Sequence, residues 1–163
     1  MACFLVSCTE NVFVHSFSTI SEEGWRRTDT LVFPIPASPT AISGKAYVEV
    51  RFDNSFPYEE LWLEVETAMG DRHRCDTIRC LLGEKNGRGF NLLQYEHLAG
   101  DILLQEGDTA FIRVHHLMEC EIVPHLREVG IRVERTPQGS ALLSVPARIN
   151  TQEDEQQNGE SPE

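Results

Sequence analysis

Residues 61–69, LWLEVETAM, decide the fold class of this chain. The apolar residues Leu61, Leu63 and Val65 stand at every second position, and mostly polar residues fill the positions between them. Successive side chains of a β-strand point to opposite faces, so this pattern predicts a strand with one buried and one exposed face. The same alternation occurs in four other long segments and three shorter ones: 46–53, 77–82, 109–118 and 127–134, and then 12–17, 31–35 and 101–105.

Clusters of Gly, Asn, Asp and Pro separate these segments, as they do at turns. No segment keeps a helical period for more than one or two turns, and residues 119–126 are expected to hold at most a short helical turn broken at Pro124. About eight strands with one apolar face each can bury those faces by stacking two sheets or by closing a barrel. We therefore predict an all-β fold, an antiparallel β-sandwich of about eight strands.

The charge of the chain excludes several kinds of partner. Its 163 residues contain 14 basic and 26 acidic side chains, which gives a net charge of −12. Nucleic acids and anionic lipid surfaces attract proteins with the opposite charge. No apolar run approaches the roughly 20 residues of a transmembrane helix. We therefore expect no nucleic-acid partner, and a membrane attachment would come from the N-terminal segment.

The end of the chain has a composition typical of disorder. Residues 151–163 contain five acidic residues, no basic residue and no apolar side chain, so they cannot bury enough surface to offset the entropy of ordering. Without them the charge is 14 − 21 = −7. We divide the chain into residues 1–8, whose Leu5-Val6-Ser7-Cys8 sequence fits a truncated lipoprotein signal ending in a lipobox, the sandwich domain at 9–146 and a disordered acidic tail at 147–163.

The N-terminal segment allows two interpretations. Residues 5–8, Leu-Val-Ser-Cys, fit a lipobox, in which the cysteine is acylated and becomes the first residue of the mature lipoprotein. The alternative is a first strand that happens to contain two cysteines. A complete signal peptide has a basic start and roughly 7–15 apolar residues, and this segment has no Lys or Arg before Cys8 and only the short apolar run 2–6.

The polar motifs favour neither catalysis nor metal binding. Cys75 and Cys80 lie five residues apart in a strand, so they point to opposite faces roughly 16 Å apart, too far for a disulfide. The simpler interpretation is that the cysteines are small buried hydrophobic residues. His115 and His116 also point to opposite faces and cannot bind one ion together. The chain has no C-x-x-C, H-x-x-x-H or G-x-S-x-G spacing. We predict no catalytic residue, metal or cofactor.

Exposed aromatic residues are the more informative feature. Trp62 shares the polar face of its strand with glutamates, and Trp25, Tyr58 and Tyr95 are expected in turns. Residues 83–97 form the longest irregular segment, and such loops are often functional. We predict a partner-binding surface that combines this loop with the Trp62 face: Trp62, Phe90 and Tyr95. The alternative is that another segment covers that face and makes Trp62 part of the core.

The order of several short motifs resembles a known family. Asn54, Pro57, Tyr58 and Leu61 form the pattern N-x-x-P-Y-x-x-L. The other motifs are Gly24-Trp25 before it, and after it Asp76-Thr77, Cys80-Leu81-Leu82, Gly87-Arg88-Gly89, Gly107 and the final strand 129–134. Over about residues 8–135 this arrangement resembles the gliding motility lipoprotein GldH family of the Bacteroidota.

The resemblance implies a function that composition does not reveal. It implies that Cys8 carries the lipid anchor and that the protein works in the cell envelope, without known catalysis or a small-molecule substrate, with other envelope proteins of the gliding and secretion machinery. Thr9, rather than an aspartate, follows Cys8, which favours the outer membrane. The alternative function is a carbohydrate-binding or glycan-processing surface lipoprotein.

Overall fold

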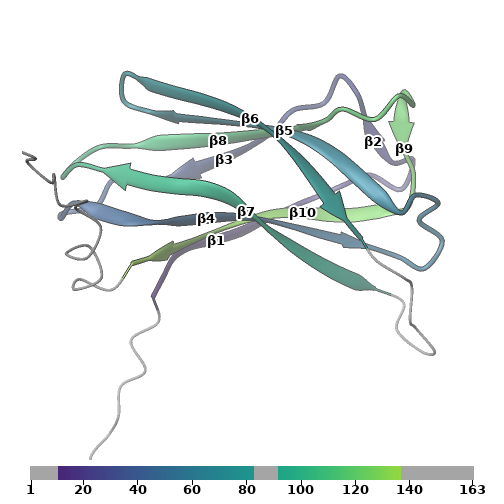
Figure 1. The fold of residues 1–163 in the computed structure, drawn as a ribbon, viewed down its shortest axis with the longest axis horizontal. Helices are drawn as coiled ribbons and strands as arrows, with labels where there is room; N and C mark the ends of the chain where they lie inside the picture. The colour runs from purple at the N-terminus through teal and green to yellow at the C-terminus, as the bar shows by residue number, and fades with distance from the viewer. Residues whose placement is uncertain (1–10, 83–91, 137–163) are drawn as a thin grey trace, which may run out of the picture.

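The computed structural model describes residues 11–82 and 92–136. Within these residues the chain forms ten strands and no helix (Figure 1). In chain order they are β1 (Val12–Thr19), β2 (Trp25–Arg26), β3 (Leu31–Ile35), β4 (Ile42–Phe52), β5 (Glu60–Met69), β6 (Arg72–Leu81), β7 (Leu93–Leu104), β8 (Ala110–His116), β9 (Ile122–Val123) and β10 (Leu126–Arg135). The proposed lipobox, Phe90 and the acidic tail lie outside the described residues.

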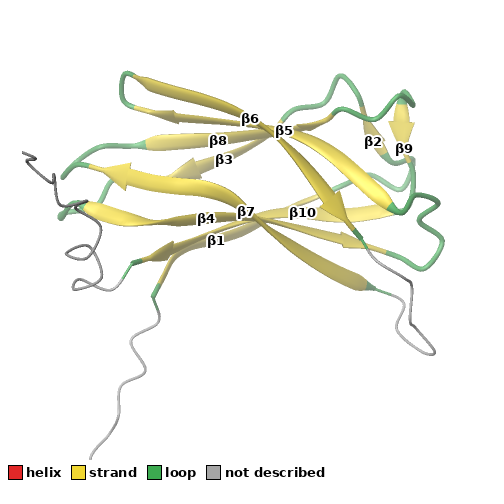
Figure 2. Ribbon diagram, in the orientation of Figure 1, coloured by secondary structure: helices red, strands yellow, loops and turns green. Residues whose placement is uncertain are grey.

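The strands form two four-stranded sheets and one small pair. The strand order is β1-β10-β4-β7 in one sheet and β3-β8-β5-β6 in the other, while β2 pairs with β9. We call the first the β4 sheet and the second the β5 sheet. Figure 2 shows the two sheets as stacked layers, and all of the pairings are antiparallel. The predicted all-β antiparallel class is confirmed.

The two sheets bury their inner faces against each other. Val50 and Ile131 of the β4 sheet and Leu63 and Val114 of the β5 sheet are each 0% exposed and belong to one core cluster. They occupy the apolar positions of the alternating segments, because a period of two sends every second side chain to the same face. Each fully buried side chain of this size stabilises the fold by about 1.5–3 kcal/mol.

Strand β7 corrects the prediction of a loop over residues 83–97. It begins at Leu93, so the second part of that segment and the short strand predicted at 101–105 belong to one strand of twelve residues. Ala46 pairs with Gly100 but Tyr47 pairs with Leu98, which leaves one extra residue in β7. This β-bulge interrupts the alternation of inward and outward side chains along β7, so the whole strand does not show one continuous pattern with a period of two.

The small β2–β9 pair corrects two further predictions. Residues 119–126 hold strand β9, not a helical turn, because Val123 pairs with Trp25 from far earlier in the chain. Trp25 is not an exposed turn residue: it is 1% exposed, and its indole N–H donates to the Asp29 carbonyl oxygen at 2.9 Å. Its ring also meets the edge of His116 at 5.4 Å between centroids.

The two ends of the sandwich carry different parts of the chain. Strand β1 begins at one end, where Val12 pairs with Glu134 at the close of β10. Strand β10 begins at the other end, where Leu126 pairs with Phe52, and the turn after Phe52 leads into β5. The β2–β9 pair lies at this second end, on the right of Figure 1.

Candidate functional site

A groove at the second end of the sandwich is the candidate site. We call it the Met118 groove; it has a volume of about 670 Å³ and is lined by side chains that include Tyr58, Glu60, Trp62, Leu117, Met118 and Cys120. The turn before β5, the first residues of β5 and the segment after β8 supply them. Its walls are therefore mostly aromatic, aliphatic and sulfur-containing, as in many binding sites.

Trp62 is held in a fixed position in this groove. It points outward from β5 and is half-buried, which confirms that it lies on the polar face of its strand. Its indole N–H donates to the Glu60 carboxylate at 3.0 Å, and the Arg79 guanidinium lies 5.6 Å from its ring centroid. The Glu60 carboxylate accepts a second hydrogen bond from Arg79 at 2.6 Å. The hydrogen bonds from Trp62 and Arg79 lower the pKa of Glu60, so this carboxylate stays charged.

The opposite wall is formed by the segment after β8. The Leu117 N–H donates to the Trp62 carbonyl oxygen at 2.8 Å, and the Trp62 N–H donates to the Met118 sulfur at 3.4 Å. The backbone pairing of β5 with β8 thus continues for one residue past the end of β8, and the Met118 side chain takes the next hydrogen bond. This places the flexible, polarizable Met118 side chain against the backbone of Trp62, where it can adapt to a bound group.

Tyr58 connects the groove to the core. Its ring lies 5.6 Å from the fully buried Phe56, which in turn lies 5.2 Å from Phe52. A hydrogen bond with the Cys120 thiol, followed by burial, raises the pKa of Tyr58. Tyr58 therefore keeps its proton at neutral pH and serves as a rigid wall rather than a base.

Two apolar side chains beside the groove remain exposed. Leu117 is 42% exposed and Leu81, at the end of β6, is 55% exposed. Leu81 pairs directly with Glu60 across the strands. Exposed leucines next to a half-buried tryptophan form the type of apolar patch that marks contact surfaces.

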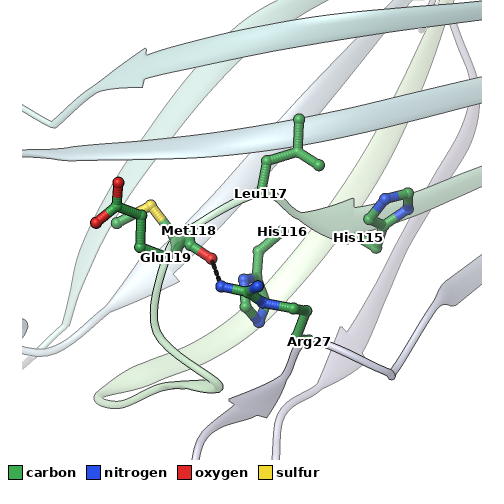
Figure 3. A pocket seen from close by; sticks show the side chains of 6 residues that line it. All are labelled: Arg27, His115, His116, Leu117, Met118 and Glu119. Atoms are coloured by element: carbon green, nitrogen blue, oxygen red, sulfur yellow. Dashed lines mark hydrogen bonds between the residues drawn. The ribbon is translucent and has the colours of Figure 1, made fainter.

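A second hollow, of about 570 Å³, shares Leu117, Met118 and Glu119 with the groove and is also lined by Arg27 and His116 (Figure 3). Here Arg27 donates to the carbonyl oxygens of Met118 at 2.5 Å and of Cys120 at 3.4 Å. These bonds fix the backbone that carries the groove wall. His116, which also lines this hollow, is 1% exposed, and its Nε2 lies 3.1 Å from the Trp25 carbonyl oxygen. Burial lowers the pKa of His116, so the ring is neutral.

The structure separates the residues of the predicted partner surface. Trp62 lies in the Met118 groove, whereas Tyr95 lies on β7 of the other sheet, pairs with Val50 and packs against the core. Phe90 lies outside the described residues. Tyr95 is therefore not a turn residue, and it does not share a face with Trp62.

The histidines and cysteines test the predictions of which side chains are buried and which are exposed. His116 is buried and His115 points outward to Glu64 at 3.5 Å, as predicted. Cys80 is buried, and burial raises its pKa to about 12. Cys75 lies on the exposed face, so its predicted burial is wrong. No group of three or more His, Cys, Asp or Glu side chains within residues 11–82 and 92–136 is placed to hold a metal ion.

A buried charge network on the outer face of the β4 sheet was missed by the sequence analysis. Glu49 is 1% exposed although it points away from the core. It accepts hydrogen bonds from His15 Nε2 at 3.0 Å and Arg132 Nε at 2.8 Å. Burial acts to raise the pKa of Glu49, but these two partners outweigh it and the pKa is lowered. Arg132 also bridges to Glu96 and Glu134, so one guanidinium joins three strands.

Comparison with solved structures finds weak likenesses of fold. The mosquito-larvicidal Cry4Aa toxin from Bacillus thuringiensis is 6% identical, with a TM-score of 0.41 over 68% of this chain and 18% of the toxin chain. Dimeric latent PorU from Porphyromonas gingivalis is 8% identical, with a TM-score of 0.33 over 76% of this chain and 13% of PorU. Eiger TNF from S. frugiperda is 10% identical, with a TM-score of 0.30 over 77% of this chain and 94% of that chain.

The family comparison is stronger. No curated protein matches the chain, and the described part of it contains no helix able to span a bilayer. The model of the family described as GldH lipoprotein matches residues 12–133, from the first residue of β1 to near the end of β10. Because this match covers most of the chain and its whole described core, the protein belongs to the GldH lipoprotein family.

Proposed function

We propose that this protein is a lipid-anchored, non-catalytic assembly component of the gliding or secretion machinery in the cell envelope, and that it binds a partner protein through the Met118 groove. Acyl chains on Cys8 would supply the anchor, as the Leu-Val-Ser-Cys sequence at 5–8 suggests. Several acyl chains hold a protein firmly, at about 0.8 kcal/mol per buried methylene. The outer membrane is the proposed location, because Thr9 follows Cys8.

The observation that carries the proposal is the position of the groove at the end of the sandwich opposite the start of β1. Only residues 9–11 separate Cys8 from Val12, so Val12 lies at most about 14 Å from an acylated cysteine. In this proposal, the end of the sandwich where β1 begins therefore faces the membrane. Strand β4 has eleven residues, so the groove is presented on the order of 30 Å further out.

The chemistry of the groove fits protein binding. Aromatic and methionine side chains are enriched at the centres of protein interfaces. The Trp62 ring is already oriented by Glu60 and Arg79, so little side-chain entropy is lost on binding. Truncation of such an anchor residue typically weakens binding by about 2 kcal/mol or more.

A photo-crosslinking experiment tests the groove. A benzophenone amino acid replaces Leu117 at the groove in a full-length precursor with a complete signal, and replaces Phe111 in the control. The two side chains are 42% and 43% exposed on the same outer face, at opposite ends of β8. We expect a discrete envelope protein to be crosslinked only from position 117, and Trp62→Ala to abolish that crosslink and impair gliding or secretion.

Two outcomes would contradict parts of this proposal. Equal crosslinking from positions 111 and 117 would remove the groove as the binding site. Failure of an alkyne fatty acid to label the wild type, or membrane retention of Cys8→Ala, would remove the anchor. Binding of a soluble glycan at Trp62 without a protein crosslink would instead support the carbohydrate-binding alternative.

A further inference from the structure

The two large sheets have four edge strands, and three of them are protected against further pairing. The edges are β1 and β7 of the β4 sheet and β3 and β6 of the β5 sheet. Pro34 in the middle of β3 has no N–H to donate to another strand. Strand β6 carries charged Arg72, Arg74, Asp76 and Arg79, and charge along an edge disfavours the approach of a second strand.

Strand β7 is protected by its bulge and by two arginines of β6. Gly100 has a φ of +136°, and the Arg74 guanidinium occupies the space that a Cβ would need there. Arg74 donates to the carbonyl oxygens of Ala99 at 3.2 Å and Asp101 at 3.3 Å, and Arg72 donates to that of Leu103. These acceptors are the edge groups to which an added strand would bond.

Strand β1 has fewer of these protections. Its eight residues, VFVHSFST, include no Pro, Gly, Lys, Arg, Asp or Glu, and its one irregularity lies at its start, between Val12 and Val14. Among the described residues its only ladder partner is β10. None of its eight side chains is buried. Every second residue of an edge strand points its backbone N–H and C=O away from the sheet, so within residues 11–82 and 92–136 the outer edge of β1 is a row of donors and acceptors without a strand partner.

We propose that the free edge of β1 accepts an extended strand from a partner protein, which adds a fifth strand to the β4 sheet. This inference goes beyond the proposed function and does not use the Met118 groove. Main-chain hydrogen bonds supply the affinity in strand addition, and alternate side chains supply the specificity.

The side chains beside the edge define the chemistry of the added strand. On the outer face, Phe17 lies beneath Arg51, whose guanidinium carbon is 3.8 Å from the ring centroid. Phe13, at the irregularity near the start of β1, packs against the core, and the Arg135 guanidinium carbon is 4.9 Å from its ring centroid. Gly130 makes room for Phe17, because a Cβ there would lie 2.5 Å from the ring. On the inner face Val14 packs against the core. Apolar or β-branched side chains at alternate positions of the partner strand would extend both surfaces.

Charge and geometry favour a partner over a second copy. Two copies each carry −12, which opposes self-association, and the uncharged β1 on an acidic protein suits a basic segment. Antiparallel pairing of β1 with itself would also place the two Val12 residues about 23 Å apart, at opposite ends of the paired strands. With the proposed anchor at Cys8, the short tethers would then leave from opposite ends and could not easily reach one membrane.

Amide hydrogen exchange on the full chain tests the inference. The probe is an acetylated eight-residue peptide that alternates Val with Thr and Lys; one control peptide has Glu in place of Lys, and another is N-methylated at every amide, so that neither of its edges can donate a hydrogen bond. We expect the Lys peptide to slow exchange at every second amide of residues 12–19 by about tenfold. The Glu peptide should protect these amides less, and the N-methylated peptide should not protect them.

A pair of chain variants locates the effect. Val12→Lys and Val32→Lys place the same charge at exposed valines, 40% and 52% exposed, on the β1 edge and on the already protected β3 edge. Only Val12→Lys should weaken protection by the Lys peptide; if Val12→Lys fails to fold, the peptide controls decide. No protection by the Lys peptide, or equal protection by the N-methylated one, would overturn the inference.

Slow exchange of β1 in the chain without peptide would also overturn it. Sedimentation would then show whether a second copy or a segment of the same chain covers the β1 edge. A dimer would show that a second copy covers the edge, and a monomer would show that a segment of the same chain, such as residues 141–145, covers it.

Discussion

The outer faces of the two sheets differ in how they use their charged side chains. On the β4 sheet, Glu49 and Arg132 are 2% and 15% exposed in their side chains and belong to one network with His15, Glu96 and Glu134. On the β5 sheet, separate pairs such as Glu66–Arg113 and Glu64–His115 have side chains that are 31–39% exposed.

The difference indicates what each face can contribute. Removal of one partner from a buried charge network leaves another charge buried and unpaired, so substitutions on the β4 face are costly, and its polar groups are already engaged with one another. Exposed pairs contribute little to stability, which leaves the β5 face free to carry the Met118 groove. We therefore expect substitutions on the first face to affect folding and substitutions on the second to affect binding.

The largest expected effect is on the buried network. Glu49→Ala leaves Arg132 and His15 without their shared acceptor, so we expect the free energy of unfolding to fall by about 3–5 kcal/mol. The matched variant Glu64→Ala on the β5 face should cost about 1 kcal/mol or less. Urea unfolding of both variants makes the comparison. Equal losses would show that the two faces do not differ in the way proposed.

The next effect concerns the close contact across β1 and β10. Gly130→Ala adds a Cβ that would lie 2.5 Å from the Phe17 ring, so we expect a loss of about 1–3 kcal/mol by overpacking. Phe17→Ala removes the ring that is in the way. In the double variant Gly130→Ala should therefore add almost no further loss, as a double-mutant cycle of thermal unfolding can measure. Additive losses would point to a backbone effect instead.

A smaller effect is the pH dependence contributed by His116. Its pKa is lowered in the folded protein, so below the unfolded value of 6.5 the unfolded chain binds a proton that the folded chain does not. The contribution is complete above pH 6.5 and declines as the pH falls towards the folded pKa. Stability measured in urea from pH 7 to pH 5 should fall less steeply in His116→Gln than in the wild type. Identical slopes would contradict the assignment.

Substitutions of Trp62 and Tyr95 distinguish an effect on binding from an effect on folding. Trp62 is half-exposed, so Trp62→Ala should lower the free energy of unfolding by only about 1 kcal/mol, while it abolishes crosslinking at the groove. Tyr95 packs against the core, so Tyr95→Ala should cost about 2 kcal/mol without a direct effect on the groove. Thermal unfolding and crosslinking of both variants test this contrast. If the Trp62→Ala variant is unfolded, Trp62 contributes to the core and not mainly to binding.

The smallest expected effect is that of the acidic tail, residues 147–163. Truncation after Arg148 removes residues with almost no apolar side chain, so the melting temperature should stay nearly unchanged. Scanning calorimetry of the full and truncated chains measures the difference. A large drop would show that the tail docks on one of the two faces.

The correct predictions from sequence concern which way individual side chains point. Leu63 and Val65 are buried and Trp62 faces outward, because alternation along a strand follows from local backbone geometry. The same rule placed His115 and His116 on opposite faces. It failed in β7, where the single extra residue at the bulge shifts the pattern.

The sequence by itself determined the fold class and the outward position of Trp62, since both follow from a period of two that each strand carries locally. The tertiary structure alone decided that Glu49 is buried, because its partner Arg132 lies 83 residues away. It also decided that Trp25 is core and that Met118 closes a groove on Trp62, 56 residues earlier. Such contacts depend on which strands lie side by side, and an alternating pattern carries no information about the neighbour.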